Sequence, residues 1–354
     1  MANETPESEL ASWSPIVWTT RGIGAWTRFW FTPIDPSGLH CLRFLSGLLF
    51  LAWLLPLFGA YSALFGLDGF FGTEAYKQAS QMQGGSPYPI GWSLIFLFGG
   101  DAGLFFWFSI AVLVLFTLGV ATRITGVLTW LVVVSHTANP ALHYDADYLL
   151  MILAFYLMIG HLLLGQFGQD QSPIGRFAGA TDLLSPFRRV SVAPSFAANL
   201  AVRLIQVHFA IIIVTSAFHK LQFAEWWTGV AFWYSLHPPR EMSIELLRDL
   251  SRTANPTLFC LSLAAYATLA WQFAFPLFAF RPRWRPLLLF GACAGWLGSA
   301  FIFRLPCFGP VYAIACLSFL TAREWAWILN RSPSIAEPAP RKDSRFRPRV
   351  GGSS

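Results

Sequence analysis

The sequence predicts an all-α protein, a polytopic transmembrane helix bundle with about eight spans and no large soluble domain. Of its 354 residues, 55% are hydrophobic and 12% are charged, and the mean hydropathy is +0.52. In soluble domains roughly a quarter of the residues are charged, so this chain is too apolar for that class. Aromatic residues reach 17%, with 16 Trp, which is typical of belts at membrane interfaces. Several apolar runs approach the roughly 20 residues that cross a hydrocarbon core.

The chain divides into three segments. We assign residues 1–32 to an N-terminal cytoplasmic tail with an interfacial segment, residues 33–322 to the transmembrane domain, and residues 323–354 to a basic cytoplasmic tail, expected to be disordered. No secretory cleavage pattern precedes the first long apolar run, so the first span is expected to be an uncleaved signal. Pro33 and Pro36 end the interfacial segment, and Ser37 is expected to cap the first span.

The apolar runs and the polar breaks between them set the expected spans. These are Leu39–Tyr61, Asp101–Thr122, Ile124–Ala138, Asp147–Phe167, a helix from Asn199 into Lys220, Leu258–Phe280, Pro286–Phe303 and Pro306–Leu320. We expect a tight turn at Thr122 and Arg123. Between the fifth and sixth spans, helical spacing within EMSIELLRDLSRTAN predicts a helix that lies flat on the membrane.

Charge predicts the orientation. An even number of spans places both termini on one side, and most of the 24 Lys and Arg residues fall on that side. By the positive-inside rule both termini are cytoplasmic, in a chain integral to the cytoplasmic (inner) membrane. Lys220 then lies at the outer face. The net charge of +6 reflects this topology and contact with membrane lipids, and we find no nucleic-acid-binding module.

The fifth span carries the main site candidate. Polar residues mark two opposite lines of this helix, one through Gln206, Ile213 and Lys220 and the other through His208, Thr215 and His219. Since lipid penalises unsatisfied polar groups on either face, we expect other helices around it, with polar partners or a wet cavity.

Lys220 has two interpretations. A lysine in a partly dehydrated pocket can act as a base near neutral pH. Alternatively, Lys220 is an interfacial anchor beside Trp226 and Trp227. Glu225 could neutralise it, which would argue against a base. His219 lies on another face of the helix, so the two residues do not form a dyad.

A second polar group, His143, Asp145 and Asp147, precedes the fourth span in HYDADYLL. The two aspartates are spaced i, i+2 and point to different helix faces, which argues against a carboxylate pair. One of them can cap the helix, and the alternative is a proton relay or a counter-charge to Lys220.

Other ionisable residues within the spans also keep two interpretations. Arg43 either snorkels to the headgroups or forms a buried structural pair. His136 and His208 are either packing histidines or functional groups. The five cysteines show no CxxC or Cys/His spacing, so we predict no metal site and assign the cysteines to packing.

Four stretches resemble a known family in the order in which they occur: PIDPSGLHCLRFLSGLLF, LFTLGVATRITGVLTW, YDADYLLMILAFYL and, most specifically, FHKLQFAEWWTGVAFWYSL. They are similar to the membrane domain of vitamin K-dependent gamma-glutamyl carboxylases, also called the horizontally transferred transmembrane (HTTM) domain. The resemblance covers roughly Pro33 to Tyr234.

The resemblance implies a membrane enzyme, a carbon–carbon lyase, that oxidises reduced vitamin K or menaquinone with oxygen and adds carbon dioxide to glutamate. The base of that family matches Lys220, with His143, Asp145, Asp147 and His219 as further catalytic candidates. Trp226, Trp227 and His208 are the candidates for quinone binding. Asp145 and Ala146 replace the family's asparagine–histidine pair, and the large peptide-docking region is absent.

The functional hypothesis is therefore a vitamin K-dependent gamma-carboxylase-like protein acting at the outward face, with a secreted Glu-containing peptide as a possible partner. The alternative is a non-enzymatic membrane module that binds a quinone, a lipid or a partner protein. The substrate, the oligomeric state and the role of the basic tail do not follow from the sequence.

Overall fold

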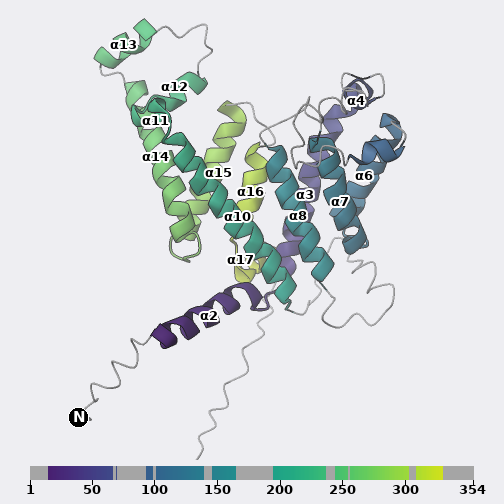
Figure 1. Ribbon diagram of the computed structural model, residues 1–354. Coiled ribbons are helices and arrows are strands. Elements are labelled where there is room, and N and C mark those ends of the chain that lie inside the picture. Colours follow the sequence, from purple (N-terminus) through teal and green to yellow (C-terminus); the bar gives the residue numbers. More distant parts are fainter. Residues whose placement is uncertain are drawn as a thin grey trace, which may run out of the picture.

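The chain is a bundle of helices in the computed structural model, which describes residues 15–66, 69, 93–98, 101–138, 146–164, 194–236, 244–253, 256–302 and 308–329 (Figure 1). Nearly all of these residues are helical. Within those ranges no strand occurs, and one isolated bridge pairs Ile34 with Ser195. The all-α prediction is confirmed.

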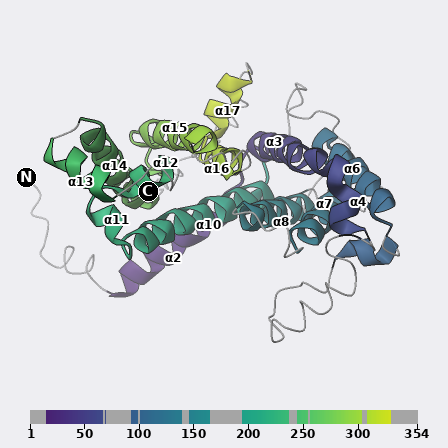
Figure 2. The same cartoon turned by 90° about the horizontal axis from the view of Figure 1, so that it is seen from above.

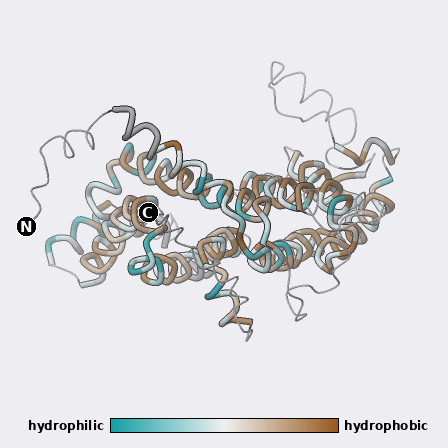
Figure 3. The backbone as a smooth tube through the Cα atoms, turned by 90° about the horizontal axis from the view of Figure 1, so that it is seen from below, coloured by the Kyte–Doolittle hydropathy of each residue, from teal (hydrophilic) through white to brown (hydrophobic). Residues whose placement is uncertain are grey.

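Three of the described helical stretches are long and apolar enough to cross a membrane: Ser37–Phe65, Phe196–Lys220 and Leu258–Phe278. Shorter apolar helices occupy Ala102–Leu118, Asp147–Leu163 and Phe308–Leu317. Hydrophobic residues run along most of the bundle (Figure 3). These features indicate a helical membrane protein.

The first half of the bundle packs α3 against α6, α6 against α7, and α7 against α8. Its elements are α2 (Pro15–Phe31), α3 (Ser37–Leu54), η1 (Leu55–Ala60), α4 (Tyr61–Phe65), η3 (Leu94–Phe98), α6 (Ala102–Leu118), α7 (Thr122–Thr137) and α8 (Asp147–Leu163). The short elements η1 and α4 continue α3, so that the three together form the first long apolar stretch.

The second half is built on α10, which packs against α8 on one side and α14 on the other (Figure 2). Its elements are α10 (Phe196–Lys220), α11 (Ala224–Trp227), α12 (Ala231–Leu236), α13 (Ile244–Arg252), α14 (Pro256–Phe278), α15 (Arg285–Ile302), α16 (Phe308–Leu317) and α17 (Ala322–Ile328). The helices α11, α12 and α13 lie beyond the Lys220 end of α10, whereas α2 and α17 lie near its opposite end (Figure 1).

Local sequence explains the ends of α6 and the start of α7. The Asp101 side chain accepts a hydrogen bond from the Leu104 amide at 2.9 Å and caps α6. Gly119 ends α6 with φ 87°, a left-handed conformation that glycine adopts without strain. The tight turn therefore occupies residues 119–121, and Thr122 and Arg123 already belong to α7, which corrects the turn predicted at that pair.

The start of α3 differs from the expectation. Ser37 does not cap the helix, because Pro36 holds the cap position and makes no side-chain hydrogen bond there. Instead the Asp35 carboxylate accepts a hydrogen bond from the Ser37 amide at 2.8 Å. Within the segment expected to be a tail, α2 is helical from Pro15, and the chain breaks at the two prolines as predicted.

Arg43 is buried in the first half of the bundle. Its side chain is 0% exposed, and Nη1 donates to the Phe116 carbonyl in the last turn of α6. The Phe116 carbonyl also accepts the Gly119 amide at 3.1 Å, so the arginine uses the second acceptor position of this oxygen. The snorkelling interpretation is therefore wrong, and the buried one holds.

The surroundings of α10 are also corrected. Only 44% of its most apolar window is buried, and Ile211 and Phe218 are 52% and 58% exposed. One face of α10 packs inside the bundle and the other remains open. The expectation that other helices surround α10 on all sides is therefore wrong. Its polar Thr215 can lie on the open face because the Thr215 hydroxyl donates to the Ile211 carbonyl of the same helix.

A final short helix, α17, lies within the segment expected to be a disordered tail. Thr321 and Glu324 form a reciprocal capping box at its start. Glu324 also pairs with Arg285 at 2.6 Å, and Trp325 is 5% exposed against Gly38 of α3. The C-terminal part of the chain is thus helical as far as Ile328 and packs onto the bundle through Trp325, whereas Trp327 and Ile328 are exposed.

The contact between α8 and α10 yields a prediction about packing. A Cβ atom on Gly160 would lie 2.7 Å from the Ala201 Cβ and 3.2 Å from a Leu39 methyl. We expect Gly160→Ala to lower the free energy of unfolding by about 1–3 kcal/mol, since overpacking forces neighbours apart. Thermal unfolding of the detergent-purified protein measures this. Gly22→Ala, where no atom lies within 4 Å, is the matched control and should leave stability unchanged.

The Glu324 capping site yields a prediction about pH. Burial raises the pKa of Glu324, but hydrogen bonds from Thr321 and Arg285 outweigh it, and the pKa is lowered. The contribution of Glu324 to stability is therefore present above its unfolded pKa of about 4.3 and is lost as the pH falls through its folded pKa. Thermal unfolding between pH 6 and pH 3 should show a smaller acid loss in Glu324→Gln than in wild type. Equal losses would contradict this role.

Candidate functional site

A cavity of about 750 Å³ lies beside Lys220, between α10, α14, α15 and α16. Trp226 of α11 and Phe232 of α12 form part of its wall. Most of the lining is apolar or aromatic, and its polar side chains include Lys220, Ser216 and Gln272. A volume of roughly 300–1,000 Å³, with few polar groups, is typical of small-molecule sites.

Lys220 enters this cavity from the last turn of α10. Its Nζ donates to the Ser216 hydroxyl at 2.6 Å, because residues four apart share a helix face. The same nitrogen lies 5.4 Å from the centroid of the Trp226 ring. Among the described residues no carboxylate pairs with it. Glu225 is exposed and does not neutralise Lys220.

Gln272 is the site residue that the sequence interpretation missed. It lies in α14, is 9% exposed, and its Nε2 is 3.4 Å from the Ser216 hydroxyl. Its Oε1 has no hydrogen-bond partner within the described part of the chain. The available signal was a lone amide in an otherwise apolar span, which is a functional candidate in a membrane helix.

Trp226 and Trp227 are neighbours in α11 but have different surroundings. Trp226 lines the cavity and packs edge-on against the Phe232 ring, with ring centroids 5.6 Å apart. Trp227 is 63% exposed and donates from Nε1 to the Leu221 carbonyl at 2.7 Å. Of these two tryptophans, Trp226 is therefore the one placed to touch a ligand in this cavity.

The two histidines of α10 lie outside the cavity lining. His219 is exposed and packs edge-on against Phe223, with ring centroids 5.1 Å apart. His208 shares a hydrogen bond of 2.6 Å with the Tyr156 hydroxyl of α8. This bond gives His208 a packing role between the two halves of the bundle.

The HYDADYLL group is described only in part. His143 and Asp145 lie outside the described residues. Asp147 is 0% exposed in the first turn of α8, where the helix dipole favours its charge, and Ala146 holds the cap position. Asp147 does not line the Lys220 cavity.

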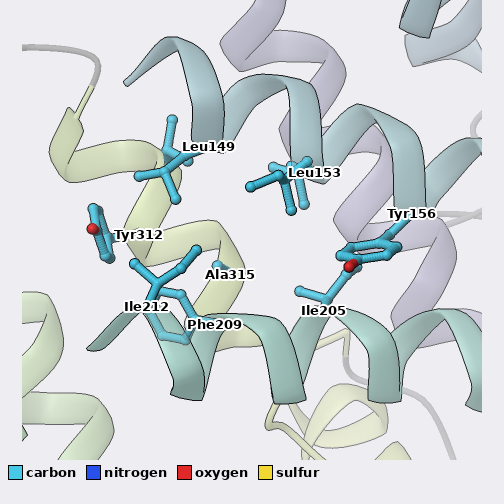
Figure 4. A pocket seen from close by; sticks show the side chains of 10 residues that line it. Leu149, Leu153, Tyr156, Ile205, Phe209, Ile212, Tyr312 and Ala315 are labelled. Atoms are coloured by element: carbon cyan, nitrogen blue, oxygen red, sulfur yellow. The ribbon is translucent and has the colours of Figure 1, made fainter. Parts of the chain in front are cut away.

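A much smaller void lies between α8, α10 and α16 (Figure 4). Its volume is about 20 Å³, with Tyr156 near one end and Tyr312 near the other. A space of this size holds at most a single water molecule. It is a packing gap, although Tyr312 also lines the Lys220 cavity.

The cysteines and acidic residues offer no metal centre where the structure is described. No three His, Cys, Asp or Glu side chains gather there. Cys41 and Cys316 are buried, Cys293 is partly buried, and Cys260 is exposed; all four are free thiols.

The turn between α11 and α12, two helices that contribute to the cavity wall, yields a prediction. Gly229 has φ 75°, and a Cβ there would lie 2.8 Å from Ser262 of α14. We expect Gly229→Ala to lower the free energy of unfolding by roughly 2 kcal/mol or more, through backbone strain and overpacking. Thermal unfolding checks this. Gly295→Ala, on the same cavity wall with no atom within 4 Å, should have little effect.

No family model, no curated protein and no solved structure matches this chain. The functional proposal accordingly rests on the Lys220 cavity and on the sequence resemblance.

Proposed function

We propose that the chain binds a membrane quinol, reduced vitamin K or menaquinol, in the Lys220 cavity and oxidises it with Lys220 as the base. The observation that carries this proposal is a lysine amine without a carboxylate partner among the described residues, at the wall of an aromatic cavity of about 750 Å³. A non-enzymatic anchor does not need such a cavity.

The cavity fits an aromatic ring in both shape and chemistry. Trp226, Trp271 and Trp296 contribute indole surfaces to its wall, against which a quinol ring can stack. Lys220 and Gln272 place a donor and an unpaired acceptor beside the same Ser216 hydroxyl. A ligand with a polar edge and an apolar body satisfies both kinds of surface.

The protein's own groups would hold and move one proton. Ser216 accepts a hydrogen bond from Nζ and fixes the direction of the Lys220 side chain. The neutral amine can then take the proton of a quinol hydroxyl placed within hydrogen-bond reach. Apolar walls keep water from the reacting groups.

The quinol supplies the reducing power, and with oxygen it provides the strong base that lets carbon dioxide add to a glutamate side chain. By its resemblance to the carboxylases, the chain would act on a glutamate of a secreted peptide at the outer face. We infer eight crossings with both termini cytoplasmic in the cytoplasmic membrane. Two observations support this topology: the charge distribution, and the positions of helices α3, α6, α7, α8, α10, α14, α15 and α16, which lie at the spans expected from the sequence.

The second candidate function is a quinone- or lipid-binding module without catalysis. The contact of the Lys220 ammonium with the Trp226 ring favours it, because lysine and tryptophan together are typical of interfacial anchoring. In this case the cavity binds its ligand and Lys220 holds the end of α10 at the membrane surface.

The test is oxygen-dependent oxidation of menaquinol or reduced vitamin K by the purified protein in nanodiscs, with the epoxide product followed. We expect Lys220→Met to lower the rate by ~10²-fold or more, because the base is removed while the side-chain volume is kept. Trp227→Phe changes an exposed ring outside the cavity and should keep the activity.

Binding is measured separately through quenching of tryptophan fluorescence by the oxidised quinone. Quenching in wild type without turnover would favour the binding module. Absence of both quenching and turnover would exclude a quinone site at Lys220.

A further inference from the structure

A second cavity, of about 430 Å³, lies at the end of α10 opposite Lys220. It is bounded by the first half of α10, the start of α3, the turn between α14 and α15, and α17. Two arginines line it, Arg203 from α10 and Arg285 from the start of α15. The quinol proposal uses neither residue.

Arg203 carries a charge that no carboxylate matches within the described residues. Its Nη1 donates to the Gln206 side chain at 2.8 Å, and the guanidinium lies 4.5 Å from the Phe29 ring centroid. Its Nε is buried without a hydrogen-bond partner. Leaving a buried donor unpaired is unfavourable, and more so for a charged group.

Arg285 is paired only in part. Its Nη2 contacts Glu324 at 2.6 Å, while its Nε is also buried without a partner. The carboxylate of Asp35 lines the cavity as well, and its Oδ1 accepts the Ser37 amide at the start of α3. Glu324 therefore compensates Arg285, and no carboxylate in the part of the chain that the structure describes forms an ion pair with Arg203.

The cavity lies at the level expected for lipid headgroups. Arg203 and Lys220 are 17 positions apart on one helix, about 26 Å at 1.5 Å per residue, close to the thickness of a hydrocarbon core. The neighbouring helix α2 exposes Ile23 and Trp26, each 65% exposed, as an interfacial helix does. An anionic group at this depth can reach the two arginines from the membrane surface.

We propose that this cavity binds the phosphate group of an anionic ligand through Arg203 and Arg285. A guanidinium presents its N–H groups in a planar fork that matches phosphate oxygens, and both arginines retain unpaired N–H groups. The phosphate can belong to a phospholipid headgroup of the leaflet opposite Lys220 or to a soluble phosphate monoester. The chemistry of the site is the same for both.

The test titrates full-length, delipidated protein in neutral detergent with phosphatidylglycerol, phosphatidylcholine and glycerol 3-phosphate, with native mass spectrometry as the readout. We expect a saturable phosphatidylglycerol complex whose affinity falls ~10-fold or more in Arg203→Gln, because a charge-assisted hydrogen bond is lost. Arg283→Gln, an exposed arginine in the turn between α14 and α15, is the matched control and should bind as wild type does.

A second pair of variants keeps both arginines and the fold. Ala322 is an exposed residue on the cavity wall at the first position of α17. Ala322→Glu adds a negative charge there and should weaken anion binding by a similar factor, whereas Ala322→Gln adds the same volume without charge and should not. Elution volume and thermal unfolding confirm that each variant is folded.

Binding of phosphatidylglycerol but not glycerol 3-phosphate would assign the site to a lipid headgroup, and competition by glycerol 3-phosphate would assign it to a soluble ester. Equal weakening in Arg283→Gln and Arg203→Gln would reduce the effect to surface charge and overturn the proposal. An affinity for phosphatidylglycerol that is the same in Ala322→Glu as in wild type would also overturn it. The same holds if wild type binds phosphatidylcholine as tightly as phosphatidylglycerol.

Discussion

The bundle depends on main-chain carbonyls at helix ends, which accept hydrogen bonds from polar side chains inside an apolar protein. Arg43 donates to the Phe116 carbonyl in the last turn of α6, Arg123 donates to the Leu164 carbonyl after α8, and Gln206 donates to the Ser318 carbonyl after α16. Carbonyls at and just after the end of a helix have acceptor capacity that the regular helix ladder does not use, and each of these contacts satisfies a side-chain donor there. Each contact also fixes one helix end against another element.

The two candidate sites lie where this pairing is incomplete. At one end of α10, the Lys220 and Gln272 side chains both donate to the Ser216 hydroxyl. The Gln272 Oε1 has no hydrogen-bond partner among the described residues. At the other end, Arg203 has an amide partner but no ionic one among the described residues. Both places adjoin cavities of several hundred Å³. A polar ligand in either cavity could use these free hydrogen-bonding groups. Both cavities are lined by α10, one at each end of the helix.

Much of the fold follows from the sequence, and less of the site. Apolar runs and their breaks located the long apolar helices to within a few residues, because hydrocarbon length and helix caps are local constraints, whereas α2 and α17 lie in segments expected to be tails. Lys220 and Trp226 were identified by their position at the end of an apolar helix, and both line the cavity. Gln272 was missed, because its partner Ser216 lies 56 positions away and only packing of α14 on α10 brings them together.

By itself the sequence determined the helical class, the membrane character and the residue types at the ends of α10. The tertiary structure decided which of those residues share a cavity. It placed Trp226 in the cavity wall and Trp227 outside it, and it buried Arg43 while leaving His219 exposed. It also brought Arg203 and Arg285, which are distant in the chain, to the lining of one cavity. Helix periodicity gives the direction of a side chain around its own axis, but the neighbour in that direction depends on how separate helices pack, a non-local property that no single span encodes.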